Sequence, residues 1–306
     1  MLLAFRTYSL RNFGHSPVRE VSVLIFRRLL FVCAFAAACS PEKSVERSAR
    51  TDDFGDTVRV GAVPQRIVSL NPTTTELLFA LGAGDRLVGR TTWDLFPAEA
   101  KDVPDLGPGI RPNVEAILAA HPDLVILYGS NDNRAASRTL RAAGVNTLSL
   151  KIDSIVQFQR AVTLLGAVLG DSARAKTVSD SVTKSLDAVR RATASLPRPT
   201  VFWHIWDAPP ITIGRGSYMN ELTDIAGGRN VYADIAAPSP TVSIEDVVRR
   251  NPDFMLAGPN GSKTMLNDQR WRQVPAVSAN RVLVLDTMVV GRPGVKLGEA
   301  AWAIAR

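Results

Sequence analysis

Short apolar runs alternate along the chain with segments that carry an apolar residue every three or four positions. The runs are typical of buried β-strands, and the longer periodic segments are typical of amphipathic helices. The strands predicted in the first half are 66–70, 86–90, 124–128 and 145–150. Helices are predicted to begin after 71–74, at 112–115 and at 132. Strands that alternate with helices predict an open, mostly parallel α/β sheet.

The chain also contains an internal repeat. Residues 113–127 (NVEAILAAHPDLVIL) align with residues 243–257 (SIEDVVRRNPDFMLA) at a constant offset of 130, and Glu, Pro and Asp coincide. A weaker echo relates two further pairs, Glu76 with Glu221 and Gly82 with Gly227. We therefore predict two similar α/β lobes, at 64–152 and 199–306.

Between the lobes lies a helical segment, 153–198, whose second part is mostly polar. Residues 171–196 carry only a narrow apolar stripe, formed by Val178, Val182, Leu186 and Val189. A helix of this length would run roughly 39 Å. We interpret it as a strut that connects the lobes; the alternative is an ordinary surface helix of one lobe.

The first 38 residues have the features of a secretory signal peptide. Arg27 and Arg28 precede an apolar run of about ten residues that ends in Ala36-Ala37-Ala38-Cys39. Because the segment before Arg27 is long for such a signal, Val21 or Val23 is an alternative start. The ending resembles a bacterial lipobox, in which Cys39 would carry lipid and anchor the exported protein to a membrane. The alternative is an ordinary secreted protein cleaved nearby. Residues 39–63 lack an apolar period and are predicted to be a flexible tether.

The net charge of +7 and the pI of about 9.8 suggest an acidic partner such as nucleic acid. Residues 1–38, however, hold five arginines and one glutamate, so their removal leaves a charge of +3. No basic cluster with interleaved aromatic residues remains. We therefore predict no nucleic-acid partner.

Signatures of enzymes are absent from the sequence. There is no Gly-x-Ser-x-Gly elbow and no phosphate-binding loop of the Walker type, and Gly82-Ala83-Gly84 follows a helix rather than a strand. Two cysteines and three histidines cannot build a metal cage of the usual kinds. We predict a protein that is not an enzyme and has no catalytic residues, metal or cofactor of its own.

Candidate binding residues lie where the predicted strands end, because ligands of open α/β sheets bind at the carboxyl ends of strands. Aromatic rings and one guanidinium at these ends suit a bulky, partly apolar ligand. The candidates are Asn71, Trp93, Tyr128, Trp206 and Arg292. Each aromatic residue could instead belong to the core. His204 is read as a buried structural histidine, with axial ligation of a metal in a macrocycle as the alternative, and either Trp203 or Trp206 is expected to face the core.

Glu115 and Glu245 occupy equivalent places in the repeat, each in the first turn of a predicted helix. One interpretation is that they complement the helix dipoles. The other is a symmetric pair of surface acids, one on each lobe, that contacts a two-fold partner with basic pockets.

Four motifs together resemble one known family. They are RIVSLNPTTTEL at 66–77, LGAGDRLVG at 81–89, PDLVI at 122–126 and AGGRNV at 226–231. They resemble the vitamin B12/ferric-siderophore class of periplasmic binding proteins, and the resemblance covers nearly all of 64–306. It implies two α/β lobes joined by a long rigid helix, little closure of the lobes, and a small-molecule ligand held between them.

The resemblance also implies partners and roles for the candidate residues. The protein would be a monomer that delivers its ligand to the permease dimer and ATPase subunits of an ABC importer. Glu115 and Glu245 match acids that dock onto permease arginines, and Trp93 and Tyr128 match ligand-facing aromatic residues. Trp206 is one place beyond such a position, Ile205, whereas Gly109 and Ser239 replace two others. Arg292 resembles an arginine at the edge of the pocket.

The function expected from these observations is that of a lipid-anchored binding protein in the cell envelope, with a corrinoid as ligand. A ferric siderophore or haem is the alternative ligand. A more distant alternative is an envelope enzyme that reuses the two-lobe fold.

Overall fold

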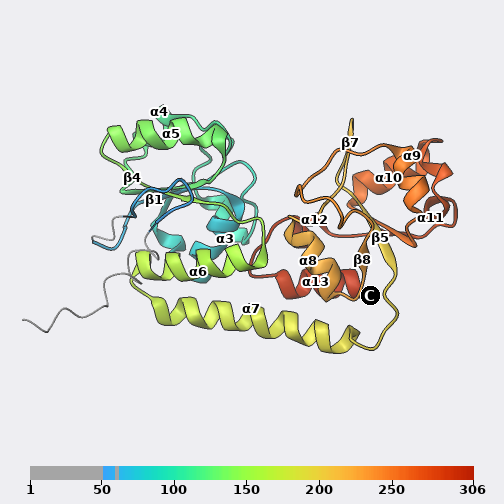
Figure 1. Cartoon of the computed structure of the whole chain (residues 1–306). Coiled ribbons are helices and arrows are strands. Elements are labelled where there is room, and N and C mark those ends of the chain that lie inside the picture. The colour runs from blue at the N-terminus through green and yellow to red at the C-terminus, as the bar shows by residue number, and fades with distance from the viewer. Residues whose placement is uncertain (1–50, 59–61) are drawn as a thin grey trace, which may run out of the picture. The chain divides into compact units, whose positions relative to one another are not determined.

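The computed structural model describes residues 51–58 and 62–306. The predicted signal peptide and Cys39 lie outside the described residues. Most of the described chain is organised around two separate sheets, each with four parallel strands (Figure 1).

The first sheet is formed by β1 (Ile67–Leu70), β2 (Leu87–Gly89), β3 (Leu124–Tyr128) and β4 (Asn146–Leu150), in the order β2-β1-β3-β4. All its neighbouring strands are parallel. The helices that follow its strands are α3 (Pro72–Ala80), α4 (Val114–Ala119) and α5 (Asn131–Ala142). Side chains on β1 and β3 alternate between two buried apolar clusters, one on each face of the sheet. Burial on both faces explains why these strands are continuous apolar runs.

The second sheet is formed by β5 (Thr200–His204), β8 (Arg229–Asn230), β9 (Phe254–Ala257) and β10 (Val282–Val284), in the order β10-β9-β5-β8. It is also parallel throughout. A short antiparallel hairpin, β6 (Trp206–Asp207) and β7 (Pro210–Ile211), follows β5. Its helices are α8 (Tyr218–Ile225), α9 (Ile244–Arg250), α10 (Pro259–Asn267), α11 (Pro275–Ser278), α12 (Thr287–Val290) and α13 (Leu297–Ala305). The predicted α/β fold with mostly parallel sheets is confirmed.

The internal repeat has the same structure in both halves. Asn113 and Ser243 cap equivalent helices, because each side chain accepts a hydrogen bond from the main-chain N–H three residues later. Asp123 and Asp253 precede the equivalent strands β3 and β9. The carboxylate of each accepts a main-chain N–H at the start of the neighbouring strand, from Gln65 and Arg66 in one sheet and from Thr200 in the other. Two similar halves are therefore built on one plan.

Two helices, α6 (Ile155–Leu169) and α7 (Ser172–Thr193), join the two halves and lie side by side (Figure 1). α7 has 22 residues, which corresponds to about 33 Å. It packs against α6, and it also packs against α8 and α13, two helices of the second half. Three residues of the predicted stripe, Val182, Leu186 and Val189, are buried in these contacts.

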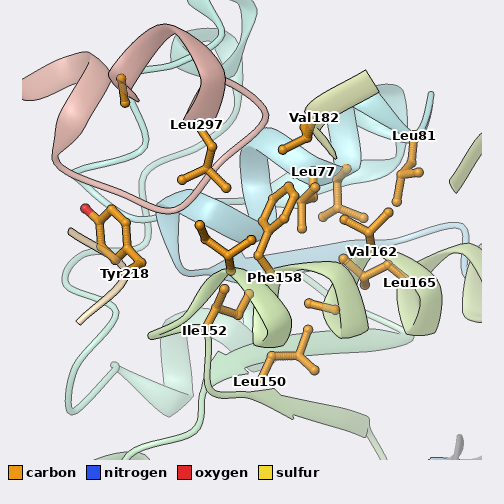
Figure 2. Packing of buried hydrophobic residues seen from close by; sticks show 14 of the residues in the cluster. Leu77, Leu81, Leu150, Ile152, Phe158, Val162, Leu165, Val182, Tyr218 and Leu297 are labelled. Atoms are coloured by element: carbon orange, nitrogen blue, oxygen red, sulfur yellow. The ribbon is translucent and has the colours of Figure 1, made fainter. Parts of the chain in front are cut away.

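The largest apolar cluster is continuous across the helices that join the halves. Leu77 of α3 and Phe158 of α6 belong to it together with Tyr218 of α8 and Leu297 of α13 (Figure 2). Burial of this much apolar surface favours a fixed arrangement of these helices.

Residues 51–58 belong to the folded body, although the sequence placed them in a flexible tether. Thr51 and Thr57 form an antiparallel bridge. The Asp52 carboxylate accepts the N–H of Ser149 at 3.0 Å, and the N–H of Asp53 donates to the Ser149 carbonyl at 2.9 Å. These contacts attach the segment to the outer edge of β4. An apolar pattern does not detect such a segment, because polar side chains and the main chain hold it.

Candidate functional site

A cavity of about 270 Å³ lies at the carboxyl ends of the strands of the first sheet. Three of the predicted ligand-binding residues, Asn71, Trp93 and Tyr128, line it together. The rest of the lining consists of Leu70, Pro72, Thr91, Pro108, Gly109 and Ile110. Because no charged side chain is among these residues, the cavity suits an apolar or neutral part of a ligand.

Trp93 is 65% exposed, which is exceptional for a tryptophan. The turn that carries Trp93 is held by Asp94, which is fully buried. The Asp94 carboxylate accepts hydrogen bonds from the hydroxyls of Thr75 at 2.6 Å and Thr91 at 2.5 Å, and from the Thr91 N–H at 3.1 Å. The Thr91 hydroxyl in turn accepts the N–H of Trp93 at 3.2 Å. Burial raises the pKa of Asp94, against the opposing effect of these hydrogen bonds.

Tyr128 ends β3 and is half-buried. Its hydroxyl donates to Asp153 at 2.6 Å. Burial is the main cause that raises the pKa of the Tyr128 phenol, and the Asp153 carboxylate adds to it. Asn133, a buried residue of α5, donates to the carbonyls of Tyr128 and Gly109 at 3.1 and 2.9 Å. It therefore joins the two segments that flank the cavity.

Gly109 has a structural reason to be glycine. An added Cβ would collide with the main-chain carbonyl oxygen of Leu70, so the loop passes too close to β1 for any side chain. The neighbouring Ile110 is exposed and lines the cavity instead.

A second cavity, of about 530 Å³, lies at the corresponding edge of the second sheet. Trp206 lines it and is 62% exposed. Trp203 is buried, and its indole N–H donates to the Thr223 hydroxyl at 2.9 Å. Of the two tryptophans, Trp203 faces the core and Trp206 the surface, as the sequence led us to expect. The remaining lining comes from residues 204, 205, 207, 219, 258–261, 287, 290 and 291.

His204 also borders the second cavity, but both of its ring nitrogens face protein atoms. Nε2 lies 2.5 Å from Oδ1 of Asp207, and Nδ1 faces Gly261 so closely that a Cβ at Gly261 would collide with it. The side chain is 3% exposed. The burial of the ring and the contact of Nε2 with Asp207 favour a structural histidine over an axial ligand to a metal.

Arg292 lies at neither cavity. Its Nε donates to Oε2 of Glu76 at 3.1 Å, and its side chain is 13% exposed. The Glu76 carboxylate is 3% exposed and also accepts the Val295 N–H at 2.6 Å. Arg292 therefore has a partner within the protein, on a helix of the other half. The sequence separation of this pair hides it from any local pattern.

Glu115 and Glu245 are exposed in the first turns of α4 and α9. The N–H of Glu245 and the Ser243 hydroxyl lower the pKa of the Glu245 carboxyl. Both side chains are thus accessible to a partner, and their positions also fit the dipole interpretation.

Three buried or half-buried polar residues near the cavities were not singled out from the sequence: Asp94, Asn133 and Asp207. Asp94 and Asp207 each follow a candidate tryptophan directly, and this adjacency is the one local signal that could have drawn attention to them. Asn133 offers no such signal.

Within residues 51–58 and 62–306, no group of three or more His, Cys, Asp or Glu side chains is placed to hold a metal ion. The same residues include no helix that is both long and apolar enough to cross a membrane.

The chain matches the family of periplasmic binding proteins over residues 67–288. It is 28% identical over 301 residues to YvrC of Bacillus subtilis, an uncharacterized ABC transporter substrate-binding lipoprotein, covering 92% of this chain and 95% of YvrC. It is 26% identical over 233 residues to the vitamin B12-binding protein of Vibrio parahaemolyticus, covering 75% and 84%. The structure of the periplasmic heme-binding protein RhuT of Roseiflexus sp. RS-1 has a TM-score of 0.71 at 27% identity, covering 79% of this chain and 98% of RhuT.

The chain therefore belongs to the periplasmic binding protein family, as the resemblance of its motifs predicted. This is a family of substrate-binding proteins that act outside the cytoplasm and not of enzymes.

Proposed function

We propose that this periplasmic binding protein holds a corrinoid between its two cavities and delivers it to the permease of an ABC importer. The observation that carries the proposal is the pair of exposed tryptophans. Trp93 and Trp206 are each more than 60% exposed, and each borders the cavity at the carboxyl edge of one of two equivalent sheets. Two rigid aromatic surfaces of this kind suit a large, flat macrocycle.

The relatives support both the transport role and the ligand class. YvrC is named as an ABC transporter substrate-binding lipoprotein, and the Vibrio relative is named for vitamin B12. RhuT, named for haem, has a similar level of identity. Haem or a ferric siderophore is therefore the second candidate ligand, in the same transport role.

Isothermal titration calorimetry and absorbance spectroscopy of the purified protein would test the ligand. We expect cyanocobalamin to bind reversibly with one molecule per chain and to shift its visible spectrum. Haemin and a ferric hydroxamate, titrated in parallel, serve as comparisons. No heat and no spectral change with cyanocobalamin up to roughly 100 μM, a concentration that detects binding of about −5.5 kcal/mol, would overturn the proposal. Turnover of a bound compound would point to an enzyme instead.

We also propose that residues 1–38 are removed and that Cys39 carries the lipid that anchors the monomer in the cell envelope. The support is the lipobox-like sequence at 36–39 and the lipoprotein name of YvrC. Metabolic labelling with a fatty acid should mark the wild-type protein and not Cys39→Ala. Equal labelling of both proteins would contradict the anchor.

A further inference from the structure

The two cavities have few charged side chains. Among the described residues, no lysine or arginine lines either of them, and Asp207 is the single carboxylate. Arg292, whose guanidinium could have supplied a cation nearby, is paired with buried Glu76. The described lining of the two cavities therefore offers one carboxylate and no lysine or arginine.

Asp207 is held so that part of its carboxylate is available to a ligand. It lies on β6, in the hairpin that follows β5, and its side chain is 38% exposed. Oδ1 is engaged by Nε2 of the buried His204 at 2.5 Å. The His204 ring is itself fixed between Trp271, with ring centroids 5.4 Å apart, and Gly261. A carboxylate held by a rigid partner is pre-organised to accept a further hydrogen bond.

The nearby arginine does not pair with this carboxylate directly. Arg270 is close enough for its charge to interact with Asp207, but its guanidinium donates to both oxygens of Asp268, the shortest contact being 2.6 Å. Among the described residues, Asp207 therefore has His204 as its direct partner and no ion pair with a lysine or arginine.

We propose that Asp207 is a specificity-determining ligand contact, which favours a ligand edge that carries amide N–H groups and disfavours one that carries carboxylates. This inference deepens the proposed function, on which it rests. A corrinoid ring is surrounded by primary amides, which donate hydrogen bonds, whereas haem and many ferric siderophores present carboxylates. A carboxylate of the ligand beside Asp207 would place two like charges together in a partly desolvated site.

The test compares cyanocobalamin with its peripheral monocarboxylic acids, in which one amide is hydrolysed. We expect the wild-type protein to bind the parent more tightly than at least one monoacid by about tenfold or more, as charged hydrogen-bond partners usually contribute. Asp207→Asn keeps the shape of the side chain. It should weaken the binding of cyanocobalamin and bring the ratio of the monoacid Kd to the cyanocobalamin Kd close to one. Asp187→Asn removes an equal charge from exposed α7 and should leave the ratio unchanged.

An unchanged ratio in Asp207→Asn would overturn the inference. Thermal unfolding of each variant shows whether the fold is kept, and Asp207→Ser is a second variant should the asparagine fail to fold. Failure of the proposed ligand gives a different result: the wild-type protein would bind haemin and not cyanocobalamin. In that case the inference requires that Asp207→Asn tighten the binding of haemin more than it tightens the binding of haemin dimethyl ester, which has no free carboxylates.

Discussion

Glu76 and Arg292 form a salt bridge of 3.1 Å although 216 residues separate them in the chain. Glu76 lies on α3, beside the first sheet, and Arg292 follows α12, beside the second. Glu221, the repeat equivalent of Glu76, accepts the N–H of Ile155 at 3.2 Å and so connects α8 with the start of α6. The weak echo in the sequence thus corresponds to two glutamates that each accept a main-chain N–H from outside their own half.

Removal of the Glu76 carboxylate should destabilise the protein strongly. Glu76→Ala leaves Arg292, 13% exposed, without its partner, and broken buried pairs usually cost about 3–5 kcal/mol. Urea denaturation followed by circular dichroism measures the change. Glu299→Ala, which breaks the exposed pair with Lys296, is the matched control and should cost less than about 1 kcal/mol. Similar losses in both variants would show that the Glu76 pair contributes little.

The same carboxyl group predicts a pH dependence of stability. Burial raises the pKa of Glu76 above its ordinary 4.5, against the lowering effects of Arg292, the Val295 N–H and Lys296. The folded state therefore holds this proton more tightly than the unfolded state does. The resulting stabilisation is complete below pH 4.5 and is lost as the pH rises through the raised pKa. The free energy of unfolding of the wild-type protein should fall relative to that of Glu76→Gln over this window. If the free energy of unfolding of the wild-type protein instead rose with pH relative to that of Glu76→Gln, the prediction would be wrong.

Loss of either exposed tryptophan should weaken ligand binding. Trp93→Ala and Trp206→Ala each remove a large aromatic surface, for which a loss of about 2 kcal/mol, or roughly 30-fold in Kd, is typical. Calorimetry with cyanocobalamin measures the effect. Phe254→Ala, at an exposed aromatic residue that lines neither cavity, is the control. If Phe254→Ala lost as much affinity as the tryptophan variants, the assignment of the cavities would be wrong.

Asp94 should act on binding through Trp93. Asp94→Asn removes an acceptor that Thr75 and Thr91 require, so the turn that presents Trp93 should become less ordered. We expect about a tenfold loss of affinity, or ~1.4 kcal/mol. In protein labelled with fluorotryptophan, the 19F resonance of Trp93 should shift or broaden, while that of buried Trp271 should not. Asp102→Asn, at an exposed residue, is the control. An unaltered Trp93 resonance would contradict this positioning role.

The two repeat-related acids should matter for transport and not for ligand binding. Glu115→Ala combined with Glu245→Ala removes two exposed charges and should weaken docking to the cognate permease by about tenfold or more, with Kd for the ligand unchanged. Glu99→Ala combined with Glu299→Ala removes the same charge elsewhere on the surface and serves as control. Equal docking by both double variants would leave Glu115 and Glu245 with the dipole interpretation alone.

The sequence alone determined the features that depend on neighbours in the chain. Apolar runs at 67–70 and 124–128 became buried parallel strands, because burial on both faces requires continuous apolar residues. The repeat at 113–127 and 243–257 became equivalent helix–strand units, because capping acts within a few residues. The narrow stripe of α7 was likewise visible, since it follows from helical spacing.

Tertiary structure alone decided which polar side chains meet. Neither the composition nor the hydrophobic period reveals that Arg292 pairs with Glu76, or that Nε2 of His204 faces Asp207. Nor does it tell that Asp52 joins residues 51–58 to β4. These pairings arise because desolvated charges and hydrogen-bonding groups must find partners wherever packing brings them, and packing joins residues that are remote in the chain. The sequence therefore predicted that the candidate residues gather where strands end, whereas the tertiary structure determined which charged groups line the cavities there.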